Sequence, residues 1–388
     1  MKTQIKNARI VTYDQIVRGD LNIADGKIVG INTPFEADEI IDAGGNYAAP
    51  GFVDIHTHGG FGHDYMDCTE EAFKVAPEKH MEHGTTSMLV TLLSADSDEL
   101  YNAILTYEKV KHQPRNGAQF LGLHLEGPYF SAAQCGAQDT KYLRNPDKKE
   151  YMKFLDATDD IRRWSAAPEL EGALEFGREM VKHGILPSIA HTDASYDEVL
   201  RAFDVGFTHI THLYSSMSTI HRVNAYRVCG VLEAAYMIDD MTVEIIADGK
   251  HLPAPLLQYV TKFKPIDKIA LCTDSVRGAG YRDGQTTILG SLTNGVEVDI
   301  DDGVAKLKDR SSFAGSIATT DRLVRTMINL AGCSVVQAIR MASTVPAKIC
   351  GFPNKGQIKA GCDADIVIFD EDVNIKKTII GGKVTYTA

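Results

Sequence analysis

Histidines and carboxylates that could bind a metal ion recur at the ends of short apolar segments along this chain. They are His56, His58, Glu126, His191, His212 and Asp274. Imidazole nitrogens and carboxylate oxygens are common protein ligands of zinc and related divalent ions, and an ion held in this way can activate water. One histidine at a strand end is more often structural, but a succession of such residues is hard to explain by chance. The pattern predicts a metal-dependent hydrolase.

Each of these residues follows a segment typical of a buried β-strand, and a helix-like segment follows most of the strands. The expected strands cover residues 52–58, 85–91, 120–126, 164–168, 185–191, 207–212, 243–248 and 269–274. Eight strand–helix units close a (β/α)8 barrel of the TIM type, an α/β fold that carries its active site at the carboxyl ends of the strands. Alternation along the first strand places Asp54, His56 and His58 on one face.

The two ends of the chain differ from the middle. Residues 1–49 contain short strand-like segments separated by turns, and residues 350–388 repeat this style. Neither end has enough strands for a stable sheet of its own, so we expect both to combine into one small β-sandwich domain. Residues 50–349 then form the hydrolase barrel, and residues 283–309 within it are expected to leave the barrel as a β-hairpin.

Composition excludes several classes of protein. The chain has 388 residues, 44% of them hydrophobic, and a net charge of −12, which disfavours nucleic acid and anionic membranes as partners. No apolar run approaches the roughly 20 residues of a membrane helix, and the first residues lack the apolar core of a signal peptide. The seven cysteines are scattered without a C-x-x-C pair. We therefore expect a cytoplasmic enzyme with reduced thiols.

The other histidines have ordinary explanations. His80, His83, His112 and His183 fall in or near helix-like segments, and we expect them at the surface. His209 has the opposite parity to His212 on its strand, so it is expected to face a helix.

Several motifs stand in a fixed order along the chain. The histidine pair lies in PGFVDIHTHGG at 50–60, Glu126 lies in HLEGPY at 124–129, and Asp274 lies in TDS at 273–275. IADGKH at 246–251 stands between them. With these motifs the whole chain resembles the amidohydrolase superfamily and, within it, the N-acetylglucosamine-6-phosphate deacetylases.

The resemblance implies a metal site and two catalytic residues. Glu126, His191 and His212 match the family's principal metal ligands. His56 and His58 match the extra ligands of members that hold a second ion, with Glu126 bridging the two ions. Asp274 matches the general base, and His251 matches the residue that binds the substrate and polarises its acetyl carbonyl. One or two ions of Zn, Fe, Mn or Co suit such a ligand set.

One feature sets the chain apart from other amidohydrolases. Many of them bridge two metals with a carboxylated lysine on the fourth strand, and no lysine occurs in the corresponding segment here, which begins with Arg163. Glu126 on the third strand takes that place, which disfavours a hydantoinase or dihydroorotase.

The departures from the deacetylases concern substrate contacts. Gln138 replaces a histidine that reaches the sugar, and Ser215 and Ser216 replace an Asn-Ala pair that contacts the phosphate. The family's Arg-Glu-Pro-Gly segment is also missing. The resemblance implies a homodimer in which Arg222 or Arg227 binds phosphate from the neighbouring subunit, and an arginine suits that task through bidentate pairing.

We expect hydrolysis of the N-acetyl group of N-acetylglucosamine 6-phosphate to glucosamine 6-phosphate and acetate. The altered contacts favour, as an alternative, a deacetylase of a different N-acetylated amino sugar, phosphorylated or not. Arg277 is a third cation expected near the barrel mouth. A non-catalytic sugar-phosphate sensor and a deaminase are further alternatives. The first is disfavoured because a sensor needs no general base, and the second because of the position of Glu126.

Overall fold

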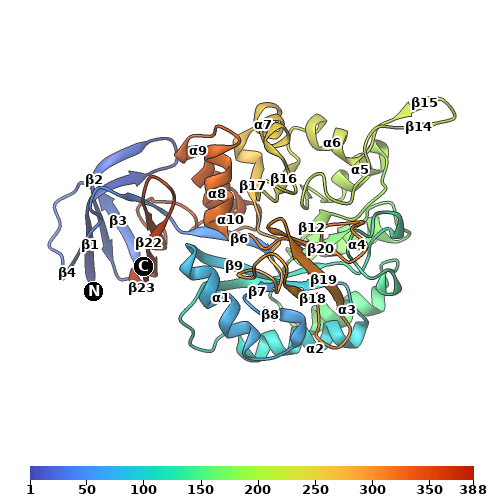
Figure 1. Ribbon diagram of the computed structural model, residues 1–388, viewed down its shortest axis with the longest axis horizontal. Coiled ribbons are helices and arrows are strands. Elements are labelled where there is room, and N and C mark those ends of the chain that lie inside the picture. Colours follow the sequence, from blue (N-terminus) through green and yellow to red (C-terminus); the bar gives the residue numbers. More distant parts are fainter.

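A parallel sheet of eight strands, rolled into a nearly closed barrel, forms the centre of the computed structural model, which describes residues 1–388 (Figure 1). Its strands, in spatial order, are β6 (Phe52–Thr57), β9 (Thr85–Leu93), β10 (Gln119–Glu126), β11 (Ile161–Ala166), β12 (Leu186–Ile189), β13 (His209–Ile210), β16 (Thr242–Ile245) and β17 (Ile269–Leu271). Most of their residues are buried, as parallel strands covered on both faces require. The predicted barrel is confirmed.

Helices that alternate with these strands surround the barrel. They are α1 (Ala72–Glu82), α2 (Ser97–Val110), α3 (Lys148–Ala157), α4 (Ala173–Lys182), α5 (Tyr196–Asp204), α6 (Val231–Met237), α7 (Ala254–Phe263), α8 (Thr320–Asn329), α9 (Val335–Ile339) and α10 (Val345–Ile349), with a π-helical turn at Arg340–Thr344. Helix α5 illustrates why these segments are helical. Ser195 and Glu198 form a capping box at its start, while Val199 and Ala202 are buried beneath it.

The seam of the barrel lies between β6 and β17. The backbone N–H of Asp274 donates to the carbonyl of His56 at 2.9 Å, and that of His58 donates to the carbonyl of Ser275 at 2.8 Å. Below them the buried carboxylate of Asp54 accepts bonds from the backbone N–H and the hydroxyl of Thr273, at 3.2 and 2.5 Å. The first and last strands are therefore fixed to one another beside the predicted metal ligands.

Six of the eight strands end earlier than their sequences suggested, and three of them are followed by a site residue with a left-handed backbone. β12, β13 and β17 stop before His191, His212 and Asp274, which were expected inside the strands. All three residues have a positive φ, of 45°, 28° and 47°. A left-handed residue cannot continue a strand, so the chain turns at each of these positions and the side chain lies across the barrel mouth.

The chain ends share one further sheet of eight strands. They are β1 (Lys2–Val11), β2 (Ile16–Ala24), β3 (Lys27–Ile31), β4 (Glu39–Asp42), β5 (Tyr47–Pro50), β21 (Ile366–Phe369), β22 (Ile375–Ile380) and β23 (Lys383–Thr387). β5 is parallel to β1 on one side and antiparallel to β21 on the other. An apolar cluster with members from both chain ends, including Ile5 and Ile366, forms its core. The sheet lies at one end of the molecule (Figure 1).

Two excursions leave the barrel. β18 (Thr286–Leu289), β19 (Val296–Asp301) and β20 (Val304–Leu307) make a three-stranded antiparallel sheet where a hairpin was expected. A hairpin of β14 (His221–Val223) and β15 (Tyr226–Val228) projects away from the barrel (Figure 1).

The remaining elements are small. The shortest strand pair is β7 (Gly59–Gly60) with β8 (His63–Asp64). Single 3₁₀ turns occur at Tyr65–Asp67, Ala132–Gln134, Thr140–Tyr142 and Ile266–Lys268. None of the helices combines the length and the hydropathy that crossing a membrane requires.

Candidate metal centre and active site

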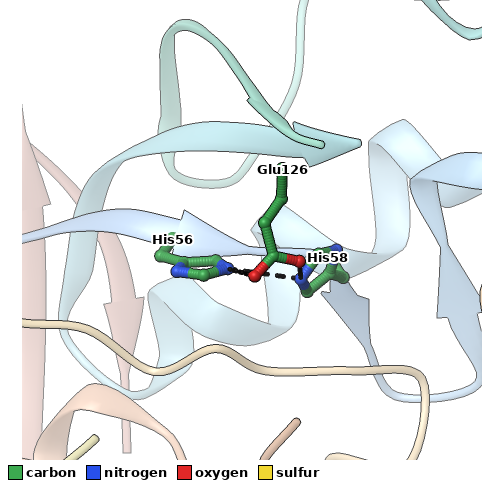
Figure 2. Close-up of side chains that lie close together, drawn as sticks. All are labelled: His56, His58 and Glu126. Carbon is green, nitrogen blue, oxygen red and sulfur yellow. Dashed lines mark hydrogen bonds and ion pairs between the residues drawn. The ribbon is translucent and has the colours of Figure 1, made fainter. Parts of the chain in front are cut away.

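Two histidines from β6 and its end meet a carboxylate from the end of β10. The Nε2 atoms of His56 and His58 lie 3.3 Å apart. Each also lies close to Glu126, at 3.5 Å from Oε1 and 3.4 Å from Oε2 respectively (Figure 2). All three side chains are buried, and their spacing suits three ligands of one ion.

A second group shares the same carboxylate. Nε2 of His212 lies 3.1 Å from Oε1 of Glu126, and Nε2 of His191 lies 3.4 Å from the same oxygen. The two ring nitrogens are 3.2 Å apart. Because Glu126 belongs to both groups, the five residues offer two adjacent metal positions with one bridging carboxylate.

The donor atoms fit divalent cations. Nδ1 of His191 lies 2.9 Å from the carbonyl of Gln134, to which it donates, so in a neutral ring Nε2 carries a lone pair. That lone pair faces His212, an arrangement that a cation between the rings stabilises. Burial alone would lower the pKa of His58, but Asp274 and Glu126 raise it to about 10. The surroundings therefore favour positive charge, as a metal site requires.

Asp274 lies beside the histidine pair. Its Oδ1 is 3.3 Å from Nε2 of His56 and 3.2 Å from Nε2 of His58. Burial would raise the pKa of Asp274, but His56 and His58 hold it below its usual range. The carboxylate is therefore ionised at neutral pH and able to accept a proton.

His251 is presented to the same cavity from the loop after β16. Its Nδ1 lies 2.9 Å from Oδ2 of Asp248, while its backbone N–H donates to Oδ1 of that carboxylate at 2.8 Å. Burial would raise the pKa of Asp248, but its bonds to His251 lower it. The ring of His251 also packs on Phe313, with centroids 4.8 Å apart.

The cavity at the barrel mouth has a volume of about 290 Å³. The predicted substrate contacts Gln138, Ser215 and Ser216 line it, but no lysine or arginine does. Gln138 is bound already, because its Nε2 donates to Oε2 of Glu126 at 2.8 Å. Sequence reasoning missed Phe313, which reaches the cavity from the segment after β20 and carried no motif signal.

The three candidate arginines lie elsewhere. Arg222 and Arg227 face each other across the β14–β15 hairpin, where both are exposed, and neither lines the cavity. The guanidinium of Arg277 makes two bonds to Asp67, at 2.7 and 2.6 Å, and its side chain is 4% exposed. Arg277, the third cation expected near the mouth, is therefore a buried tie between loops and does not line the cavity.

Two histidine predictions were also wrong. His80 is fully buried, and its Nε2 donates to the carbonyl of Gly59 at 2.8 Å. His209 does not face a helix but points into the barrel, where Nε2 lies 3.5 Å from Glu244. In strands buried on both faces, parity alone does not say which side chains point inward.

A parallel (β/α)8 barrel with histidines and a carboxylate at the strand ends defines the class of the amidohydrolases. The sequence profile of the Amidohydrolase family matches residues 47–385, and the chain belongs to this family.

Individual relatives of the chain point to one kind of amidohydrolase. The N-acetylglucosamine-6-phosphate deacetylase of Bacillus subtilis is 32% identical over 392 residues, covering 98% of this chain and 96% of that protein. The human deacetylase of the same name is 32% identical over 400 residues, with 99% and 96% covered. The Mycobacterium smegmatis deacetylase, solved as a mutant in complex with N-acetyl-D-glucosamine-6-phosphate, has a TM-score of 0.89. It is 29% identical, with 100% of this chain and 99% of that chain covered. The resemblance inferred from the motifs is thus confirmed.

Proposed function

We propose that this protein hydrolyses the N-acetyl group of N-acetylglucosamine 6-phosphate, releasing glucosamine 6-phosphate and acetate. The observation that carries the proposal is that a metal-ligand set, the carboxylate of Asp274 and the imidazole of His251 all converge on one cavity. Amide hydrolysis needs these three parts, namely an activated water, a proton carrier and a donor for the developing oxyanion.

The metal ligands in this proposal are Glu126, His191 and His212, with His56 and His58 holding a second ion. Zn, Fe, Mn or Co bound there would lower the pKa of the attacking water and polarise the acetyl carbonyl. Glu126 would serve both positions, because Oε1 lies within 3.5 Å of His56, His191 and His212, and Oε2 lies 3.4 Å from His58.

Asp274 and His251 carry the proton and charge chemistry. Asp274 accepts a proton from the attacking water and then delivers it to the leaving nitrogen, so one carboxylate serves both steps in sequence. In its doubly protonated form, with the Nδ1–H bound to the carboxylate of Asp248, His251 donates a hydrogen bond from Nε2 to the carbonyl oxygen as negative charge develops there. Phe313 covers the ring of His251 and limits its exposure to water.

The phosphate contacts need a second copy of the chain. No lysine or arginine lines the cavity of one chain, whereas Arg222 and Arg227 project from the barrel on an exposed hairpin. We therefore infer a homodimer in which this hairpin supplies an arginine to the neighbouring cavity, and a cytoplasmic enzyme of amino-sugar metabolism.

Acetate release by metal-reconstituted protein tests the proposal. The substrates are N-acetylglucosamine 6-phosphate, its galactosamine isomer and the two unphosphorylated sugars, with Asp274→Asn as control. We expect the glucosamine phosphate to react fastest and the control to lose roughly 10²–10⁴-fold in kcat. Absence of turnover with all four compounds would contradict the proposal.

A second candidate is deacetylation of a different N-acetylated amino sugar. It is favoured by Gln138, Ser215 and Ser216, which replace the family's sugar and phosphate contacts at the cavity wall. Faster turnover of another sugar in the same assay, still abolished by Asp274→Asn, would establish this alternative.

A further inference from the structure

An ion pair with no exposure to solvent lies inside the barrel beneath the metal cluster. Nη1 of Arg163 is 2.5 Å from Oε2 of Glu244, and Nη2 is 3.0 Å from Oε1. Both side chains are 0% exposed. Arg163 comes from β11 and Glu244 from β16, which are separated by two strands, so the pair spans the barrel interior.

The surrounding barrel satisfies the arginine completely. Its Nε donates to the hydroxyl of Ser188 at 3.0 Å, and Nη2 donates to the hydroxyl of Thr211 at 2.6 Å. Nη1 also donates to the carbonyl of Ile55 at 3.3 Å. Taking two charges out of water is costly, and apolar residues of similar size often stabilise a core equally well. Stability alone therefore does not explain the pair.

Glu244 binds the ring of one histidine of the metal cluster and the backbone of another. Its Oε1 lies 2.7 Å from Nδ1 of His56 and also accepts the backbone N–H of His212 at 3.3 Å. The other histidines of the cluster differ. Nδ1 has no partner in His58 and His212, and it binds a backbone carbonyl in His191. His56 is the only one whose Nδ1 is held by a carboxylate.

The bond to Glu244 decides which ring nitrogen of His56 carries the proton. A neutral imidazole has one N–H, and the carboxylate can only accept, so the proton is held on Nδ1. Nε2 then carries the lone pair, and this is the atom that faces His58 and Glu126. Without an acceptor at Nδ1, the proton is free to occupy Nε2 and block that position.

We propose that Arg163 and Glu244 are positioning residues for the ion held by His56, His58 and Glu126. Glu244 fixes the tautomer of His56, and Arg163 fixes Glu244. The inference rests on the metal centre of the proposed function. Removing such an outer partner typically weakens metal binding by roughly 10–100-fold, and here the loss should be confined to the histidine-pair position.

Titration of metal-free protein with Co²⁺ tests this proposal. Bound ions are counted by elemental analysis and followed by the visible absorption of Co²⁺. We expect two ions in the unaltered protein. In Arg163→Met/Glu244→Leu, which removes both charges and the acceptor, we expect the second ion to bind roughly 10–100-fold more weakly, as in His56→Asn.

A rescue variant separates positioning from packing. Arg163→Met/Glu244→Gln keeps a carbonyl oxygen for Nδ1 of His56, so we expect it to retain two ions. The matched control is Lys355→Met/Asp365→Asn, which removes another ion pair, 2.6 Å apart, in which Asp365 is buried and the side chain of Lys355 is 12% exposed. We expect that variant to keep two ions whatever its stability.

Three results would overturn the inference. They are a single ion in the unaltered protein, two equally tight ions in Arg163→Met/Glu244→Leu, and failure of the glutamine variant to restore the second ion. Circular dichroism and thermal unfolding identify any variant that does not fold, and the glutamine and leucine variants differ little in volume. Because ions rather than turnover are measured, the result is independent of which sugar the enzyme accepts.

Discussion

The carboxylate of Asp248 holds His251 by two bonds, one to the ring and one to the backbone. Oδ2 lies 2.9 Å from Nδ1, and Oδ1 accepts the backbone N–H at 2.8 Å. The ring is thereby fixed in the wall of the cavity with Nε2 as its free nitrogen. When the ring carries a proton on both nitrogens, Nε2 is a donor already held in place, and it needs no reorganisation as charge develops on the substrate.

Substitution at this pair should lower kcat. We expect kcat to fall roughly 10²–10³-fold in His251→Asn, which removes the oxyanion donor. Asp248→Asn should cost roughly 10–100-fold, the equivalent of one hydrogen bond to a charged group. Steady-state kinetics with metal content measured in parallel checks both values. Unchanged kcat in His251→Asn would show that this histidine does not contact the reacting carbonyl.

Removal of the metal should abolish activity and weaken the fold. Nε2 of His191 and Nε2 of His212 lie 3.2 Å apart, so an ion bound by both rings would tie the ends of two strands together. An ion present at about 1,000 times its Kd contributes about 4 kcal/mol to the free energy of unfolding. Calorimetry before and after chelation, and again after Co²⁺ is restored, measures this. A chelated protein with unaltered Tm and full activity would contradict the metal centre.

Loss of the hairpin arginine should affect phosphorylated substrates alone. Arg222→Ala and Arg227→Ala are each compared with Arg201→Ala, an exposed arginine on α5. We expect one of the two hairpin variants to raise KM for the sugar phosphate by roughly 10–100-fold, since a charge-assisted bond is lost. KM for the unphosphorylated sugar should stay the same. An equal effect on both substrates would exclude phosphate recognition by this hairpin.

Arg277 should be needed for stability and not for phosphate. Arg277→Met leaves the buried carboxylate of Asp67 without its partner, which costs about 3–5 kcal/mol. Asp67→Asn added to this variant should recover part of the loss, because no charge then remains buried. Urea unfolding of the two variants measures the free energy lost in Arg277→Met and the part recovered when Asp67→Asn is added. A stable Arg277→Met protein with raised KM only for the sugar phosphate would restore the original expectation.

His80 makes stability depend on pH. Burial lowers the pKa of His80 to about 4, against an ordinary value of 6.5. Between these values the unfolded chain binds more protons, so the free energy of unfolding falls as the pH falls from 6.5 toward 4, by up to about 1.4 kcal/mol per pH unit. His80→Gln keeps an N–H for Gly59 but does not titrate. Urea unfolding at several pH values should show a shallower decline for this variant, and parallel curves would contradict the assignment.

Period-two alternation and strand-end placement were enough to predict the barrel and most of the metal cluster. Asp54, His56 and His58 share a face, and Glu126 ends the third strand, so their convergence followed from the fold. The left-handed turn at His191 was not visible, because a positive φ at a non-glycine residue is imposed by tertiary contacts. The division of domains at residues 50 and 349 stays a prediction.

Pairings across the barrel could not be predicted. Arg163 and Glu244 come from strands whose side chains are buried on both faces. The sequence of neither strand says which of its residues point into the barrel or which residue of another strand they contact. The β14–β15 hairpin lacked apolar alternation because it is exposed, although Asn224 at its turn was a signal for a positive φ. Charged residues inside apolar segments deserve the same scrutiny as strand-end histidines.

The place of β5 between β1 and β21 sets an order of assembly during synthesis on the ribosome. All of the barrel is translated before Ile366 emerges, so β1 to β5 wait with the backbone groups of β5 unpaired on one side. Such an uncovered edge is where foreign strands attach. Strand β21, which follows the barrel in the chain, is therefore the one that protects β5. A chain that stops short of β21 is expected to keep an intact barrel sequence and yet aggregate through the exposed edge of β5.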